Sequence, residues 1–249
     1  MKNSILFLSF MMTLDLSAQS LQGDVISTNN GDLTIQPILH GTLGLEWNGK
    51  IIYIDPYGGE EAFAGLPDPD MIVITDIHGD HHNPKTLDIL NTEGVKFIVP
   101  QAVADKMEVE YDLQIMGNGD AWSWEGISIE ALPMYNLPED ETSRHAKGRG
   151  NGYILTFGGK RVYISGDTED IPEMRALENI DVAFVCMNLP YTMSIDQASD
   201  AVLAFEPAIV YPFHFRGTEG LADVDQFKSM VNNKNGNIEV RLREWYPSK

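Results

Sequence analysis

Two segments of this chain follow the same pattern of strand, tight turn and strand. Residues 47–55 read Trp-Asn-Gly-Lys-Ile-Ile-Tyr-Ile-Asp, and residues 157–167 read Phe-Gly-Gly-Lys-Arg-Val-Tyr-Ile-Ser-Gly-Asp. Asn-Gly and Gly-Gly favour tight hairpin turns because both tolerate positive φ. Each hairpin ends in an acidic residue, Asp55 or Asp167. The repetition predicts two related β-rich halves.

Short apolar runs that alternate with helical segments complete both halves. The expected strands are 33–39, 43–47, 51–54, 71–74, 97–99, 127–132, 153–157, 162–164, 182–185, 209–211 and 238–242, and the expected helices are 84–91, 102–107, 172–177, 195–205 and 224–232. Each sheet needs cover on both faces. We therefore expect an α/β (α+β) fold, a four-layer αββα sandwich. It forms one domain, since no linker rich in Pro, Ser or Gly divides the chain.

The N-terminus has the order of a secretory signal peptide. A short polar start precedes the apolar run 5–14, and small residues follow it. We predict a signal peptide at 1–20, cleaved after Ala18 or Ser20, with a single domain at 21–249. The run is shorter than the roughly 20 apolar residues of a membrane-spanning helix. We expect a secreted or periplasmic protein without a stable membrane span; the alternative is a buried first helix.

The charge of the chain limits its partners. The sequence has 17 basic and 37 acidic residues, a formal net charge of −20. A polyanion is repelled at long range, so nucleic acid is not expected as a partner. Arg144, Lys147 and Arg149 gather three cations in the long loop 136–150. They are candidates to hold an anionic group of a small-molecule substrate, and the alternative is a solvated loop.

The densest group of potential metal ligands follows the apolar run 71–74. There the chain reads Thr75-Asp76-Ile77-His78-Gly79-Asp80-His81-His82. Holding such groups together costs hydration, and a divalent cation offsets that cost. Further candidates follow in order, each after a strand or in a loop: His145, Asp167 and His214. The order predicts a metal centre at one edge of the sandwich.

The same positions carry a resemblance to a known family. Thr-x-x-His-x-Asp-His, a loop His, Gly-Asp-Thr and Pro-x-His follow one another as in metallo-β-lactamase-fold hydrolases, most clearly over residues 33–216. The chain is more similar to the branch that includes L-ascorbate-6-phosphate lactonase and N-acyl phosphatidylethanolamine phospholipase D. That similarity lies in Ile54-Asp55-Pro56, Tyr135-Asn136, the loop 145–153 and Pro190-Tyr191-Thr192-Met193. One position departs from the family, because Asp76 stands where the family has its first His.

The resemblance implies two metal sites that share one residue. Site one would be Asp76, His78 and His145, site two would be Asp80, His81 and His214, and Asp167 would bridge them. The catalytic residues implied are Asp80 and His145, with Asp80 orienting a metal-bridging hydroxide as the nucleophile. Asp55 would hold a ligand His from outside the site. His40 would line the site or lie in a turn, and Asn136 would replace His145 if that ring were solvated.

Asp76 changes the chemistry that site one offers. A carboxylate oxygen is a harder and more negative ligand than an imidazole nitrogen. Zinc accepts both, so we expect two divalent metal ions, with zinc first and manganese or iron also suited. A weakened site one would leave a mononuclear enzyme.

These features together predict a metal-dependent hydrolase in which water attacks an ester, lactone, amide or phosphodiester. The alternative is a metal-binding member of the same fold without catalysis. A redox di-iron protein is disfavoured, since that branch carries Glu at the position of His78 and an attached flavin domain. The choice of substrate depends on loops, and β-lactams are not implied.

Overall fold

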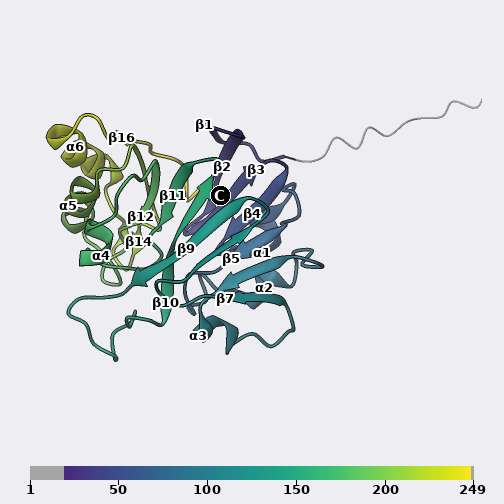
Figure 1. The fold of residues 1–249 in the computed structure, drawn as a ribbon. Coiled ribbons are helices and arrows are strands. Elements are labelled where there is room, and N and C mark those ends of the chain that lie inside the picture. The colour runs from purple at the N-terminus through teal and green to yellow at the C-terminus, as the bar shows by residue number, and fades with distance from the viewer. Residues whose placement is uncertain (1–19, 248–249) are drawn as a thin grey trace, which may run out of the picture.

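The computed structural model describes residues 20–247, and their strands form two seven-stranded sheets (Figure 1). The first sheet has the order β1 (Asp24–Thr28), β2 (Gly31–Leu39), β3 (Thr42–Trp47), β4 (Lys50–Ile54), β5 (Met71–Val73), β6 (Lys96–Val99) and β7 (Asp112–Ile115). The second has the order β16 (Glu239–Val240), β13 (Ile209–Phe213), β12 (Val182–Cys186), β11 (Lys160–Ile164), β10 (Gly150–Phe157), β9 (Ile127–Met134) and β8 (Ala121–Trp124). A small ribbon pairs β14 (Arg216–Gly217) with β15 (Gly220–Leu221).

The two sheets share one plan, as the repeated hairpins predicted. In the first, β1 to β4 pair antiparallel and β4 to β7 pair parallel. In the second, β8 to β11 pair antiparallel, and β11, β12, β13 and β16 pair parallel. The carboxyl ends of neighbouring parallel strands meet at the same edge of a sheet, where open α/β sheets bind their ligands. The strands β4 and β11 are equivalent, because each pairs antiparallel with one neighbour and parallel with the other. Asp55 follows β4, and Asp167 follows β11.

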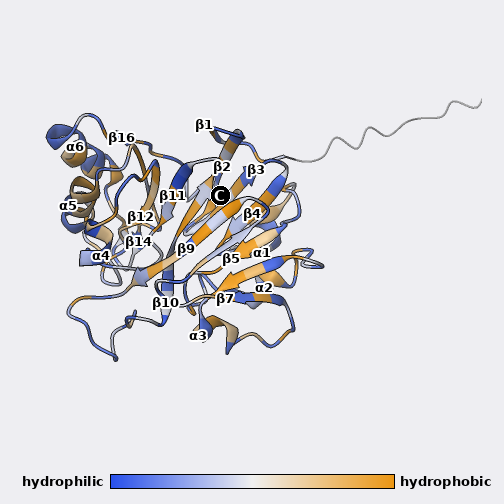
Figure 2. Cartoon of the chain, viewed as in Figure 1, coloured by the Kyte–Doolittle hydropathy of each residue, from blue (hydrophilic) through white to orange (hydrophobic). Residues whose placement is uncertain are grey.

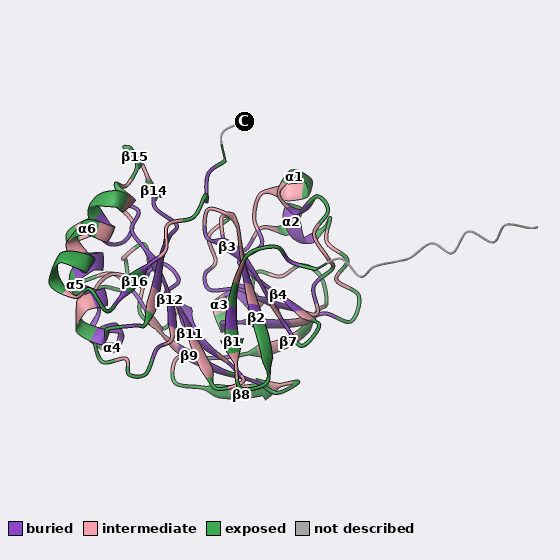
Figure 3. Cartoon of the chain, turned by 90° about the horizontal axis from the view of Figure 1, so that it is seen from above, coloured by how far each residue is buried: buried purple, intermediate pink, exposed green. Residues whose placement is uncertain are grey.

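Helices cover the outer faces of both sheets. The structure has α1 (Gly59–Phe63), α2 (Pro84–Leu87), α3 (Gln101–Ala104), α4 (Pro172–Arg175), α5 (Ile195–Phe205) and α6 (Val224–Lys234). Seen from above, α4, α5 and α6 lie outside one sheet, and α1 and α2 lie outside the other (Figure 3). The predicted four-layer αββα sandwich of the metallo-β-lactamase fold is confirmed.

Strand alternation explains why this arrangement buries both faces of the first sheet. In β4, Ile52 and Ile54 belong to the core between the sheets, whereas Ile51 and Tyr53 pack in the cluster under the helices. The core between the sheets also contains Tyr153 and many other residues of the second sheet. Parallel strands covered on both faces are near-continuously apolar, and every residue of β5 and β12 is buried. Figure 2 shows the hydropathy of each residue along the chain.

Most predicted elements are present, and two of the helices begin at capping side chains. Asn83 caps α2 by accepting from the Thr86 amide at 3.0 Å, and Asp223 caps α6 by accepting from the Gln226 amide at 2.9 Å. The predicted helix 84–91 ends earlier. The strands β1, β7 and β8 and the helix α1 were not predicted, because their residues are half exposed and lack an apolar period.

The predicted signal peptide lies outside the described residues, except for Ser20. Among residues 20–247, no helix is long and apolar enough to cross a membrane. Cys186 is fully buried in β12, and burial raises the pKa of its thiol to about 11.

Candidate metal centre

The predicted ligands converge because each follows a strand at the carboxyl edge or lies in the loop beside it. Asp76 follows β5, Asp167 follows β11 and His214 follows β13 directly. His40, Asp55 and His214 have positive φ values of 59°, 45° and 47°. Positive φ is unfavourable for residues with a side chain and is concentrated at functional sites. The three turns directly follow β2, β4 and β13, so both sheets contribute to the centre.

The first donor set is the one predicted as site one. One ligand atom each from Asp76, His78 and His145 lies within 4.8 Å of the others. Asn136 does not compete with His145. Its side-chain oxygen accepts from the His145 amide at 2.8 Å, and its amide nitrogen donates to Glu169 and Tyr191. Asn136 therefore holds the loop that presents the buried His145 ring.

Asp167 connects this set to the second one. Its Oδ2 lies 3.2 Å from His145 Nε2 and 3.3 Å from His81 Nε2, and its Oδ1 lies 3.6 Å from His214 Nε2. His81, Asp167 and His214 form a second set of donors within 4.8 Å. One carboxylate thus faces imidazoles of both predicted sites, which is the geometry a bridging ligand needs.

Asp80 lies at the outer side of the second set. Its Oδ2 is 3.4 Å from His214 Nε2, and its Oδ1 is 4.0 Å from His81 Nε2. Its side chain is 33% exposed, compared with 5% for Asp167 and none for Asp76. Asp80 and the partly exposed His78 therefore form the solvent-facing side of the centre.

His40 lines the centre, which is one of the two positions that the sequence left open. It joins Asp80 and His214 in a third donor set, and its ring lies 3.8 Å from that of His214. Burial lowers the pKa of His40, which favours the neutral ring. The His40 Nε2–H then donates to Asp80 at 3.2 Å, and Tyr246 Oη donates to Nδ1 at 2.7 Å. The positive-φ turn at His40 and the position of Tyr246 near the C-terminus create these contacts. No local sequence motif predicts either of them.

Asp55 acts as predicted for a residue outside the donor sets. Its Oδ2 lies 2.7 Å from His81 Nδ1, and it also accepts from the Thr75 amide and hydroxyl at 2.7 and 2.6 Å. With Nδ1–H donating to Asp55, Nε2 of His81 points toward Asp167 and would offer its lone pair to a bound metal ion. This arrangement selects one tautomer and one ring orientation for a metal ligand. His82 is buried and belongs to none of the three sets.

Unpaired buried polar atoms provide a test of whether a metal fits. Side-chain atoms at the centre that are buried without a hydrogen-bond partner are Asp76 Oδ2, His78 Nδ1, His81 Nε2, Asp167 Oδ1 and both ring nitrogens of His145 and His214. Each unsatisfied buried group costs about 1–3 kcal/mol. Their concentration at one place, with carboxylate oxygens facing imidazole nitrogens, suits divalent cations bound by carboxylate and imidazole.

The carboxylates are ionised and ready to bind a cation. Burial alone would raise the pKa of Asp167, but the rings of His214 and His81 hold that pKa well below its ordinary value. Burial also opposes ionisation of Asp76, and the contact with His78 and the charges of His81 and Arg149 lower its pKa overall. His214 and His40 likewise outweigh burial to lower the pKa of Asp80.

The three cations of the loop have separate partners. Arg144 lies over the ring of Tyr191 at 4.3 Å. Lys147 lies 2.9 Å from carboxylate oxygens of both Glu139 and Glu173. Arg149 Nη2 lies 3.5 Å from Asp76 Oδ1. They do not form one anion site; two pair with carboxylates, and only Arg149 contacts a predicted ligand.

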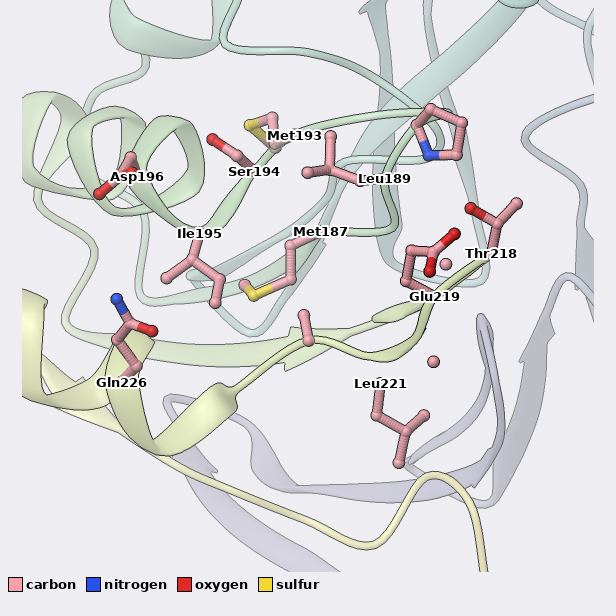
Figure 4. Close-up of a pocket in the computed structure, with 14 residues that line it drawn as sticks. Met187, Leu189, Met193, Ser194, Ile195, Asp196, Thr218, Glu219, Leu221 and Gln226 are labelled. Carbon is pink, nitrogen blue, oxygen red and sulfur yellow. The ribbon is translucent and has the colours of Figure 1, made fainter.

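A pocket of about 460 Å³ lies beside the ends of β12 and β13, of which β13 leads into His214. Its wall is formed by the segment that follows β12, the start of α5 and the ribbon β14–β15 that follows His214. Figure 4 shows Met187, Leu189 and Leu221 among its side chains. Leu189 and Leu221 are 52% and 53% exposed. The pocket therefore offers an apolar surface to a small molecule.

The contact between Asp55 and His81 has a measurable consequence. We expect Asp55→Ala to lower divalent-metal affinity about 10–100-fold, the usual effect of losing such a partner. Competition with a chromophoric chelator measures this affinity. Asp70→Ala is the matched control, since Asp70 binds Lys50 and the Ile51 amide at the opposite end of β4. Equal metal affinity in Asp55→Ala and the wild type would contradict the orienting role.

Comparison with known proteins agrees with this geometry. The model of the β-lactamase superfamily domain matches residues 34–214. A metal-dependent hydrolase of the UPF0173 group from Pyrococcus abyssi is 28% identical over 207 residues, which cover 78% of this chain and 90% of the relative. A UPF0173 metal-dependent hydrolase from Staphylococcus carnosus is 28% identical over 218 residues, 81% of this chain and 94% of the relative.

Solved structures extend the likeness. A protein from Parabacteroides distasonis, assigned as a metal-dependent hydrolase, is 38% identical, with a TM-score of 0.80 over 91% of this chain and 100% of that chain. A metallo hydrolase from Ignicoccus hospitalis is 27% identical, with a TM-score of 0.73 over 85% of this chain and 95% of that chain. The chain belongs to the β-lactamase superfamily and is a metal-dependent hydrolase of the metallo-β-lactamase fold.

Proposed function

We propose that this hydrolase binds two divalent metal ions at the centre and uses them to hydrolyse a small-molecule ester, lactone, amide or phosphodiester. The observation that supports this most is the position of Asp167 between two donor sets. Its Oδ2 faces both His145 of site one and His81 of site two, and its Oδ1 faces His214 of site two. A single-metal site would need no carboxylate shared in this way.

The ligand residues would divide the work as follows. Asp76, His78 and His145 would hold one ion, Asp80, His81 and His214 the other, and Asp167 both. Bound ions would lower the pKa of a water molecule toward about 7 and stabilise negative charge in the transition state. Asp55 fixes His81 through Nδ1, and His40 fixes Asp80 through a 3.2 Å hydrogen bond. Asp80, the most exposed carboxylate of the centre, is positioned to orient the attacking water.

The ligand chemistry supports zinc as the ion. Four of the seven residues are histidines, and zinc binds imidazole and carboxylate together. The three carboxylates also suit manganese or iron, which prefer harder ligands. His78 stands where a redox di-iron site of this fold would have Glu, so the donor set favours hydrolysis.

The surroundings of the centre support a small substrate with an apolar part. The centre is open at Asp80 and His78, and the apolar pocket lined by Leu189 and Leu221 lies at the same edge of the sheet. The pocket is within the size range of small-molecule sites. Its rim carries Glu219 and Asp196, so an anionic group would bind elsewhere.

Hydrolysis of a panel of aryl esters, lactones, amides and phosphodiesters tests the proposed function. We expect turnover of at least one class by the metal-loaded protein and loss of turnover after chelation. Asp167→Asn is expected to reduce kcat/KM at least about a hundredfold, because it removes the shared charge. Asp170→Asn is the control, since Asp170 pairs with Arg175 away from the centre. Bound metal without turnover of any substrate would favour a non-catalytic metal-binding protein.

We also propose that residues 1–20 direct export and that the working enzyme is secreted or periplasmic. The order of polar start, apolar run and small residues supports this. N-terminal sequencing of the protein produced in its native host tests this proposal. A mature start at Gln19 or Leu21 is expected, and an intact Met1 on the exported or retained protein would contradict it.

A further inference from the structure

Asp76 is unusual among the ligands because a cation lies against it. Arg149 Nη2 is 3.5 Å from Asp76 Oδ1, while Asp76 Oδ2 faces His78. Among residues 20–247, Arg149 is the only lysine or arginine within 4.0 Å of a carboxylate oxygen of the centre. Every other ion pair of these carboxylates within that distance is formed with a histidine.

The backbone holds Arg149 at this position. The Asn151 amide donates to the Thr75 carbonyl at 2.9 Å, so the start of β10 runs along the segment that carries Asp76. Gly150 permits this approach, since a Cβ there would lie 2.7 Å from Thr75 O and 3.2 Å from Asp76 Oδ1. Arg149 also donates to the Arg144 carbonyl. Nη2 of the guanidinium therefore faces both the Arg144 carbonyl and Asp76, and the side chain is only 24% exposed.

The charges of the centre explain what such a cation would do. The predicted ligands include three carboxylates, Asp76, Asp80 and Asp167. With two divalent ions bound, the net charge of the centre would therefore be −3 + 4 = +1. A neutral ligand in place of Asp76 would leave −2 + 4 = +2. With Arg149 included, the present centre also reaches −3 + 4 + 1 = +2. Arg149 thus restores the charge that a histidine at position 76 would give.

We propose that Arg149 is the counter-charge of Asp76, and that it weakens the affinity of site one for divalent metal so that this site holds the more readily exchanged ion. The proposal rests on the proposed function, because it assumes that both sites bind metal. In the metal-free protein, Asp76 is stabilised by Arg149. A metal ion at site one must compete for that carboxylate and is repelled by the guanidinium.

Stepwise metal titration of the full mature chain tests this without any substrate. Metal-free protein is titrated with Zn²⁺ in competition with a chromophoric chelator. We expect two binding steps in the wild type, with the weaker one absent in Asp76→Ala and both present in Asp76→His. Arg149→Met is expected to tighten the weaker step about tenfold, as one unit charge removed near a divalent ion implies. The stronger step should change much less.

Matched variants separate charge from packing. Arg149→Lys keeps the charge and should bind zinc within a few-fold of the wild type. Arg144→Met removes the same charge from the same loop without touching Asp76, and should leave both steps unchanged. Arg149→Gln keeps a donor for the Arg144 carbonyl and repeats the test if the Met variant does not fold, as judged by circular dichroism.

The outcomes distinguish this proposal from the proposed function. The counter-charge role would be overturned if zinc binds in two steps and Arg149→Met or Arg149→Gln leaves the weaker step unchanged or weakens it further. The same result with a raised KM for an anionic substrate would make Arg149 a substrate-binding residue instead. A wild-type chain that binds no zinc would contradict the metal centre itself, and with it the proposed function.

Discussion

The contact of Asp167 with three imidazoles is the interaction on which the rest of the centre depends. His81, His145 and His214 come from three separate parts of the chain, and each has a ring nitrogen within 3.6 Å of this one carboxylate. Asp167 is almost completely buried, so its charge is tolerated only beside cations or strong donors. Its Oδ1 and nitrogens of the surrounding rings are buried without a hydrogen-bond partner, which suits a bound cation.

The fold supplies this convergence through its repeated plan. Each sheet changes from antiparallel to parallel at its central hairpin, and the strands after that change open at one edge. Asp55 and Asp167 occupy equivalent positions after β4 and β11, yet their roles differ. Asp167 faces both donor sets, whereas Asp55 binds the far nitrogen of His81. One structural repeat therefore provides a candidate bridging residue and a residue that orients a ligand.

Much of this arrangement could be predicted from the sequence because its signals are local. Apolar runs between Gly-rich turns located the buried strands, and the ligands lie directly after them. The edge strands β1, β7 and β8 escaped prediction because exposed strands have no strong apolar pattern. The contacts of His40 with Asp80 and of Arg149 with Asp76 escaped it for another reason. Each joins residues that lie close only after the sheets have packed, and neither forms a motif. The three loop cations were considered together, but they bind separate partners.

Anomalous diffraction at the zinc edge, from crystals of the zinc-loaded protein, tests the central claim most directly. The account predicts two peaks on opposite sides of Asp167. One should lie among Asp76, His78 and His145, and the other among Asp80, His81 and His214. A single peak, or peaks only at other residues, would contradict a two-metal centre built from these seven side chains.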